Sequence, residues 1–117
     1  MIILVVDDDP DIREIVSLVL AGEGHEVRSA ADGIEALELL RAGLGPSLVL
    51  LDMMMPRLDG ESFLQQMRAN PALAATRVII LSGQVGAREK AAELNVAGCL
   101  VKPIALEDLL RAIHHLA

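Results

Sequence analysis

Asp52 stands at the end of an unbroken apolar run, Leu48–Leu51, and Pro56 follows shortly after it. Consecutive apolar residues without polar alternation predict a strand that is buried on both faces, and the proline hinders its continuation. A carboxylate at the end of a buried strand is costly unless a neighbouring group uses its charge. We therefore take Asp52 as the candidate reactive residue.

Three more apolar runs end in residues that could assist Asp52. Ile2–Val6 is followed by Asp7 and Asp8, Val78–Leu81 by Ser82, and Cys99–Val101 by Lys102. If the runs are parallel strands, right-handed connections place their carboxyl ends at one edge of a sheet. The order of the runs thus predicts that these side chains meet there. A purely structural ion-pair cluster is the alternative, but it would not explain why so many strand ends coincide.

The predicted edge carries an excess of negative charge. Three carboxylates within a few ångströms repel one another by several kcal/mol per pair at an effective dielectric constant of ~20, and Lys102 offsets only one charge. A divalent cation brings the formal sum to zero, and oxygen-only ligands favour Mg²⁺. Asp52 could then attack a phosphoryl group to give an aspartyl phosphate, with Lys102 and the Ser82 hydroxyl stabilising the transferred oxygens.

Helices are predicted between these strands from caps, stops and helical spacing. They run from the Asp9–Pro10 cap to Gly22, from the Asp32 capping box to Gly43, from Asp59–Gly60 to Asn70–Pro71, from Ala87 to about Asn95, and through Leu106–Ile113. The fourth carries mostly alanine on its apolar face, so we expect it to pack loosely. A weaker strand, Glu26–Ser29, is expected near the sheet edge.

Five strands that alternate with five helices predict an α/β fold with a doubly wound parallel sheet. The 117 residues suit one domain, 1–117. A net charge of −7, with scattered basic residues, one Phe and no Trp or Tyr, argues against direct nucleic acid binding. No apolar run is long enough to cross a membrane, and no secretory signal is recognisable. The single cysteine fits a reducing compartment, so we expect a cytoplasmic protein.

Four motifs in this order resemble the receiver domain of two-component response regulators, over essentially the whole chain. They are Val5–Asp8, Leu51–Asp52 with Met55–Pro56 and Asp59–Gly60, Ser82–Gly83, and Val101–Pro103. The resemblance implies a flavodoxin-like sheet with strand order 2-1-3-4-5. It also implies that Asp52 accepts phosphate from a histidine kinase or a histidine phosphotransfer protein.

The resemblance further implies roles for the other residues at the edge. Asp7, Asp8, Asp52 and the Met54 backbone carbonyl would hold Mg²⁺, and Ser82 and Lys102 would contact the phosphoryl group. Phosphorylation and dephosphorylation would be self-catalysed, so the domain would not be an enzyme in the ordinary sense. The state would pass to an output domain or target through the fourth helix, last strand and last helix, and a phosphorylation-dependent homodimer is one form this could take.

Cys99 departs from the family pattern, which usually has Tyr or Phe at this position to swing inward as the Ser or Thr moves. We expect Cys99 to be a small apolar core residue, and the signal to travel instead through the Ser82–Gly86 loop and the fourth helix. Two other functions stay open. One is a phosphatase that uses an aspartyl phosphate, although Met54 stands where such enzymes commonly have a second acid. The other is a degenerate receiver that binds partners without phosphate.

Overall fold

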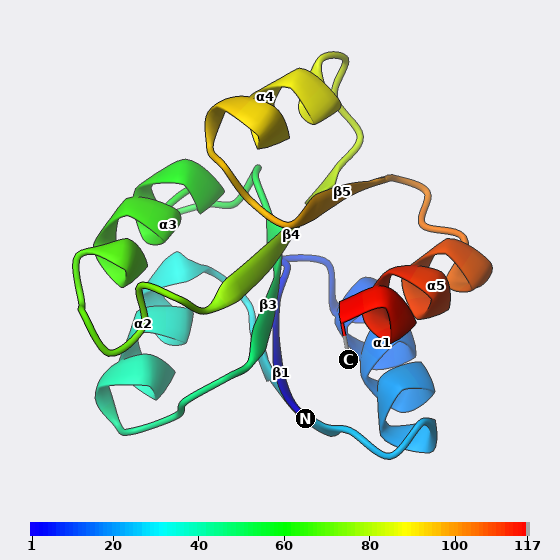
Figure 1. The fold of residues 1–117 in the computed structure, drawn as a ribbon, viewed down its shortest axis with the longest axis horizontal. Helices are drawn as coiled ribbons and strands as arrows, with labels where there is room; N and C mark the ends of the chain where they lie inside the picture. The colour runs from blue at the N-terminus through cyan, green and yellow to red at the C-terminus, as the bar shows by residue number, and fades with distance from the viewer. Residues whose placement is uncertain (117) are drawn as a thin grey trace.

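Five parallel strands and five helices alternate through the computed structural model, which describes residues 1–116 (Figure 1). The strands are β1 (Ile2–Val6), β2 (Glu26–Ala30), β3 (Leu48–Asp52), β4 (Arg77–Ser82) and β5 (Gly98–Val101). The helices are α1 (Pro10–Gly22), α2 (Gly33–Arg41), α3 (Gly60–Arg68), α4 (Ala87–Glu93) and α5 (Leu106–Leu116). The strand order is β2-β1-β3-β4-β5, as predicted.

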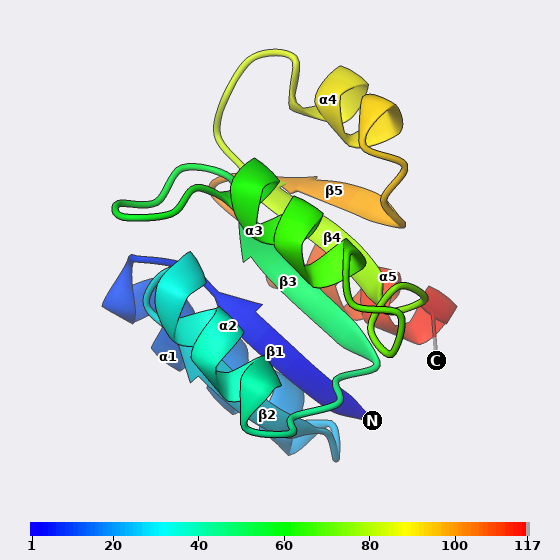
Figure 2. The ribbon, with the colours of Figure 1, turned by 90° about the vertical axis from the view of Figure 1, so that its left-hand side faces the viewer.

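The sheet brings the strand ends to one edge. Every neighbouring pair is parallel, and the register sets Val6 beside Leu51 and Asp52 beside Leu81. In Figure 2 the arrowheads of β1, β3 and β5 point to the same side. The residues at the carboxyl ends of β1, β3, β4 and β5 therefore share this edge. This confirms the prediction that the carboxyl ends of the strands meet at one edge of the sheet.

Apolar side chains form a core on each face of the sheet. On one face, α2 and α3 pack against β1 and β3, and Phe63, Leu64 and Met67 of α3 are buried there. On the other face lie α1 and α5, with Leu20 and Leu109 buried (Figure 1). All residues of β3 are buried, as its unbroken apolar run predicts.

The β5 side of the sheet is less buried. No residue of β5 is fully buried, and the buried residues of α4 are only Ala87 and Ala91. Polar contacts from α3 supplement this packing: Glu61 forms an ion pair with Lys90 at 2.6 Å, and Arg68 donates to the carbonyls of Leu94 and Asn95. The alanine-rich face predicted for α4 is confirmed.

Some predicted boundaries were wrong. α4 ends at Glu93 rather than about Asn95, because the chain turns there and Asn95 adopts a left-handed φ of 54°. β2 extends to Ala30, and β5 begins at Gly98. Within residues 1–116, none of the helices has the length and apolar character needed to cross a membrane.

Candidate functional site

Asp52 ends the central strand β3 and is 3% exposed. Its Oδ1 accepts a hydrogen bond from the Met54 N–H at 3.1 Å, and its Oδ2 lies 3.4 Å from the Lys102 Nζ. Burial raises the pKa of the Asp52 carboxyl to about 6, and the nearby charge of Asp7 adds to this effect. The hydrogen bond from the Met54 N–H and the charge of the Lys102 ammonium lower this pKa, but by less than burial and the Asp7 charge together raise it. Asp52 is thus held in place by its neighbours but keeps an unusual affinity for a proton.

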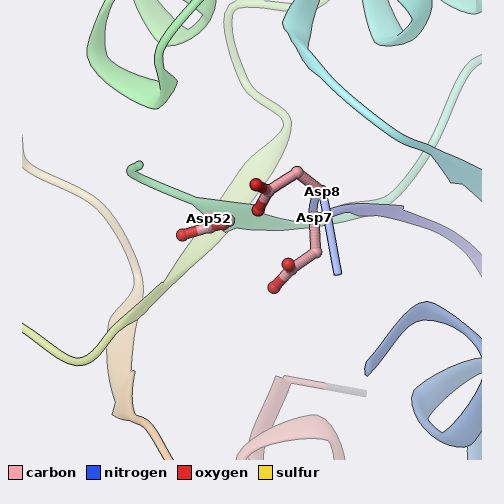
Figure 3. Close-up of side chains that lie close together, drawn as sticks. All are labelled: Asp7, Asp8 and Asp52. Carbon is pink, nitrogen blue, oxygen red and sulfur yellow. The ribbon is translucent and has the colours of Figure 1, made fainter. Parts of the chain in front are cut away.

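Asp7 and Asp8 follow β1 and complete an acidic group with Asp52 (Figure 3). One oxygen from each carboxylate lies within 4.8 Å of the other two. Asp7 is fully buried and its Oδ1 accepts from the Asp9 N–H at 2.9 Å, whereas Asp8 is exposed. The cluster is therefore closed at Asp7 and open to solvent at Asp8.

Lys102 follows β5 and faces two of the carboxylates. Its Nζ lies 2.9 Å from the Asp7 Oδ2 and 3.4 Å from the Asp52 Oδ2. Burial works against the charge of Lys102, but the two carboxylates outweigh it and raise the pKa of the ammonium. One cation thus stabilises two anions that the sheet forces together, and the third carboxylate has no such partner among residues 1–116.

Ser82 closes the edge on the β4 side. It is buried, and its Oγ accepts from the Gln84 N–H at 3.1 Å, while its carbonyl accepts from the Lys102 N–H at 2.9 Å. A cavity of about 290 Å³ lies on this side of the site, lined by Met53, Met54, Ser82, Gln84, Lys90 and neighbouring residues of the β4–α4 loop. A group that enters this cavity meets the Ser82 side chain.

Gly60 allows the loop that follows β3 to fold back on the strand. A Cβ at this position would lie 2.6 Å from the Asp52 carbonyl and 2.8 Å from the Met53 Cα. Such distances to backbone atoms exclude any side chain without movement of the strand end. Gly60 thus allows the backbone of the loop to lie against the end of β3, next to Asp52. Asp59 caps α3 by accepting from the Ser62 N–H, as expected.

The donor set fits a hard divalent cation. The Asp7 Oδ2 is wholly buried and makes no hydrogen bond of good geometry within residues 1–116, although Lys102 is near. A buried oxygen without a hydrogen bond is expensive, and cation coordination would satisfy it. Carboxylate oxygens alone, at an edge that opens to water at Asp8, are the ligands that Mg²⁺ prefers.

Two contacts at this edge escaped the sequence analysis. Arg13 of α1 donates to the Asp7 carbonyl at 2.8 Å, and Arg57 forms an ion pair with Asp32. No local pattern indicates either contact, because each joins residues of different elements. One prediction was wrong: Cys99 is only half-buried, since β5 lies at the edge of the sheet, and it lines a surface groove with Arg88 and Arg111. Partial burial raises the pKa of its thiol, which disfavours the thiolate form.

Comparison with known proteins decides the family. The family model described as response regulator receiver domain matches residues 3–114. The chain belongs to this family. It is a phosphoacceptor signalling domain of the two-component type, and the family match confirms the resemblance inferred from the four motifs.

Similar proteins agree with this assignment. The response regulator MprA of a Mycobacterium species is 41% identical over 108 residues, which are 92% of this chain and 46% of MprA. The DNA-binding regulator RpaA of Synechocystis is 34% identical over 97% of this chain and 48% of its own length. The chain thus spans about half the length of these relatives. The solved structure of the chemotaxis response regulator CheY4 of Vibrio cholerae matches with a TM-score of 0.89 at 30% identity, over 99% of this chain and 98% of the CheY4 chain.

Proposed function

We propose that Asp52 is the residue that accepts the phosphoryl group. The observation that supports this is how differently the three carboxylates are held. The Asp7 Oδ1 accepts from the Asp9 N–H, the Asp7 Oδ2 lies 2.9 Å from the Lys102 Nζ, and Asp8 lies exposed at the rim. Asp52 is also oriented at one oxygen by a backbone N–H, but its other oxygen lies 3.4 Å from the Lys102 Nζ, so this oxygen is held less closely than that of Asp7 and is better placed to attack.

The reaction that follows is a transfer between two nucleophiles. The Asp52 Oδ2 attacks phosphorus, the bond between phosphorus and the nitrogen of a phosphohistidine breaks, and the imidazole leaves with that electron pair and takes up a proton. Lys102 moves its charge to a phosphoryl oxygen, and the Ser82 hydroxyl donates to another. Hydrolysis of the acyl phosphate would use the same groups, so we regard the chemistry as self-catalysed and not as enzymatic turnover.

We further propose that the domain works with Mg²⁺, held by Asp7, Asp8, Asp52 and the Met54 carbonyl. The ion would supply positive charge against the phosphoryl oxygens and remove part of the repulsion between the carboxylates. The support is the wholly buried Asp7 oxygen and the closeness of the three carboxylates. This intact acidic group also weighs against a degenerate receiver that binds partners without phosphate.

The partner that fits this chemistry is a histidine kinase or a histidine phosphotransfer protein. We propose the cytoplasm as the location, because the one cysteine is free and fits a reducing compartment. The proposed output surface consists of α4, β5 and α5, where the groove beside Cys99 has a volume of about 440 Å³. An output domain, a target protein or a second copy after phosphorylation would bind there. Direct contact of this domain with nucleic acid is not part of the proposal.

The assignment is tested by measuring intact mass after incubation with phosphoramidate and Mg²⁺. The parent should gain one phosphoryl group, and chelation of the metal should slow the gain. Asp52→Asn should gain none, whereas Asp59→Asn, a matched change at a helix cap near the site, should label like the parent. Labelling of Asp52→Asn at the parent's rate would show that another residue is the acceptor.

A further inference from the structure

The loop between β3 and α3, residues 53–59, has to hold Met54 against Asp52. The Met54 N–H donates to the Asp52 Oδ1 at 3.1 Å, and the Gly60 N–H donates to the Met53 carbonyl at 3.2 Å. These bonds fix the two ends of the loop. Its middle makes one internal bond, from the Leu58 N–H to the Pro56 carbonyl at 2.8 Å. Something outside the loop must hold the middle if the ends are to stay in place.

Arg57 provides such a contact from the middle of the loop. Its Nε lies 2.7 Å and its Nη2 2.6 Å from the Asp32 Oδ2, at the start of α2. The Asp32 side chain is 9% exposed, and its other oxygen accepts from the Glu35 N–H at 2.9 Å. Asp32 therefore caps one helix and anchors a distant loop with the same carboxylate. Burial alone would raise the pKa of Asp32, but the Glu35 N–H and Arg57 lower it, so the anchor stays ionised.

The backbone at Arg57 shows that this position is constrained. Its φ is 67°, in the left-handed region that favours glycine, and a side chain there strains the backbone. The structure keeps a long side chain at a strained position, and that side chain makes a two-nitrogen contact with a buried carboxylate. A second contact joins the same two turns, since a Cβ at Gly33 would lie 3.0 Å from the Leu58 side chain and carbonyl.

We propose that Asp32 and Arg57 are positioning residues for the phosphoacceptor site: their ion pair fixes the loop so that Met54 stays against Asp52. This inference rests on the proposed function, because it gives the loop a task in metal binding and phosphoryl transfer. The path is short. Arg57 sits between Met54 and Gly60 in the sequence, so release of its side chain frees the segment whose first residues contact Asp52.

Two variants distinguish a role of the ion pair in positioning Met54 from a role in the stability of the fold alone. Asp32→Asn keeps the helix cap, because asparagine caps as well as aspartate, but it removes the charge that holds Arg57. Arg57→Gly removes the guanidinium and also relieves the strained φ, so it should unfold no more readily than Asp32→Asn. Asp59→Asn is the matched control: it alters a helix-capping aspartate of the same loop that accepts from Ser62 and lies in no ion pair within residues 1–116.

The measurements are the Mg²⁺ dissociation constant by calorimetry and the exchange rate of the Met54 amide by NMR. Asp32→Asn and Arg57→Gly should each weaken Mg²⁺ binding about tenfold, the lower end of what outer-shell partners of a metal site contribute. The double variant should be no weaker than either single one, because both changes break one pair. The Met54 amide should exchange faster in both variants, and Asp59→Asn should leave both quantities at the parent's values.

Folded variants with a parent-like Mg²⁺ dissociation constant and a parent-like Met54 amide would overturn the proposal. If both variants unfold, Arg57→Lys is measured instead; it keeps the charge, loses the planar fork and should give an intermediate loss of affinity. Loss of affinity in Asp59→Asn equal to that in Asp32→Asn would also contradict it. These readouts need no phosphate donor, so they stand apart from the labelling of Asp52 that tests the proposed function.

Discussion

The α3–β3 region (Leu48–Arg68) and the α4–β5 region (Ala87–Val101) both border the site but are held in different ways. Every residue of β3 is buried, and α3 inserts Phe63, Leu64 and Met67 into the core. No residue of β5 is buried, and α4 buries two alanines. The apolar area that fixes a helix is therefore large for α3 and small for α4.

This difference matches the tasks of the two regions. Asp52 ends β3, where firm packing can hold a carboxylate close to Asp7 in spite of their repulsion. Lys102 follows β5, and the cavity lined by Ser82 extends toward α4. The side chains of the Glu61–Lys90 ion pair that supports α4 are 38% and 46% exposed, and ion pairs open to solvent in this way contribute little. Asp52 thus ends the well-packed region, beside Asp7 at the end of the largely buried β1, while Ser82 and Lys102 border the weakly packed region.

The strongest test of the rigid region is Phe63→Ala. Phe63 is fully buried in the core between the sheet, α2 and α3. Its truncation should lower the free energy of unfolding by about 3–5 kcal/mol, through lost burial and the cavity left behind. Urea unfolding followed by circular dichroism measures the loss. Leu106→Ala, at an exposed leucine, is the control and should cost far less; equal losses would contradict the comparison.

Asp52→Asn tests whether burying the Asp52 carboxylate in the α3–β3 region lowers the free energy of unfolding. The pKa of Asp52 is about 6 in the folded state and near 3.8 in the unfolded state, so the folded state binds the proton more tightly. As pH rises from about 4 to above 6, the parent loses stability relative to the variant. Asp52→Asn should therefore be more stable by on the order of 2 kcal/mol at pH 7.5 without Mg²⁺. The difference in free energy of unfolding between parent and variant should vanish near pH 4. A difference that stays constant with pH would contradict the raised pKa of Asp52.

Ala91→Gly tests the weakly held region and should have the smallest effect. Ala91 is one of the two buried residues of α4, and glycine in a helix interior costs about 1 kcal/mol. We expect the amides of α4 to exchange roughly fivefold faster, since that energy corresponds to such a factor. The amides of α3 should keep their rates. A loss of several kcal/mol in global stability would show that α4 belongs to the main core.

Much of this arrangement could be predicted because strong local signals mark it. Unbroken apolar runs predict the strands, and the residues that follow these runs predict that Asp7, Asp52, Ser82 and Lys102 lie at one edge, as the structure has them. Their roles toward phosphate and metal stay predictions. The sequence also showed that α4 lacks large apolar residues, but the same lack of an apolar pattern left its end uncertain by two residues.

Contacts between distant segments could not be predicted in this way. Asp32 was recognised as a cap, and the structure confirms this, but its ion pair with Arg57 spans 25 positions and leaves no periodic trace. The sequence predicts Cys99 as a small apolar core residue, but it is only half-buried. The sheet order makes its strand an edge, and an edge strand with a small side chain leaves a groove instead.

Amide hydrogen exchange with and without beryllofluoride and Mg²⁺ tests the contrast between the two regions most directly. We expect the phosphate mimic to change amide exchange between Ser82 and Val101, including α4, and to leave the amides of α3 close to their original exchange rates. Asp52→Asn should show no change on addition of the mimic. A response confined to α3 or α1, with Ser82–Val101 unaffected, would contradict the claim that the weakly held region carries the signal.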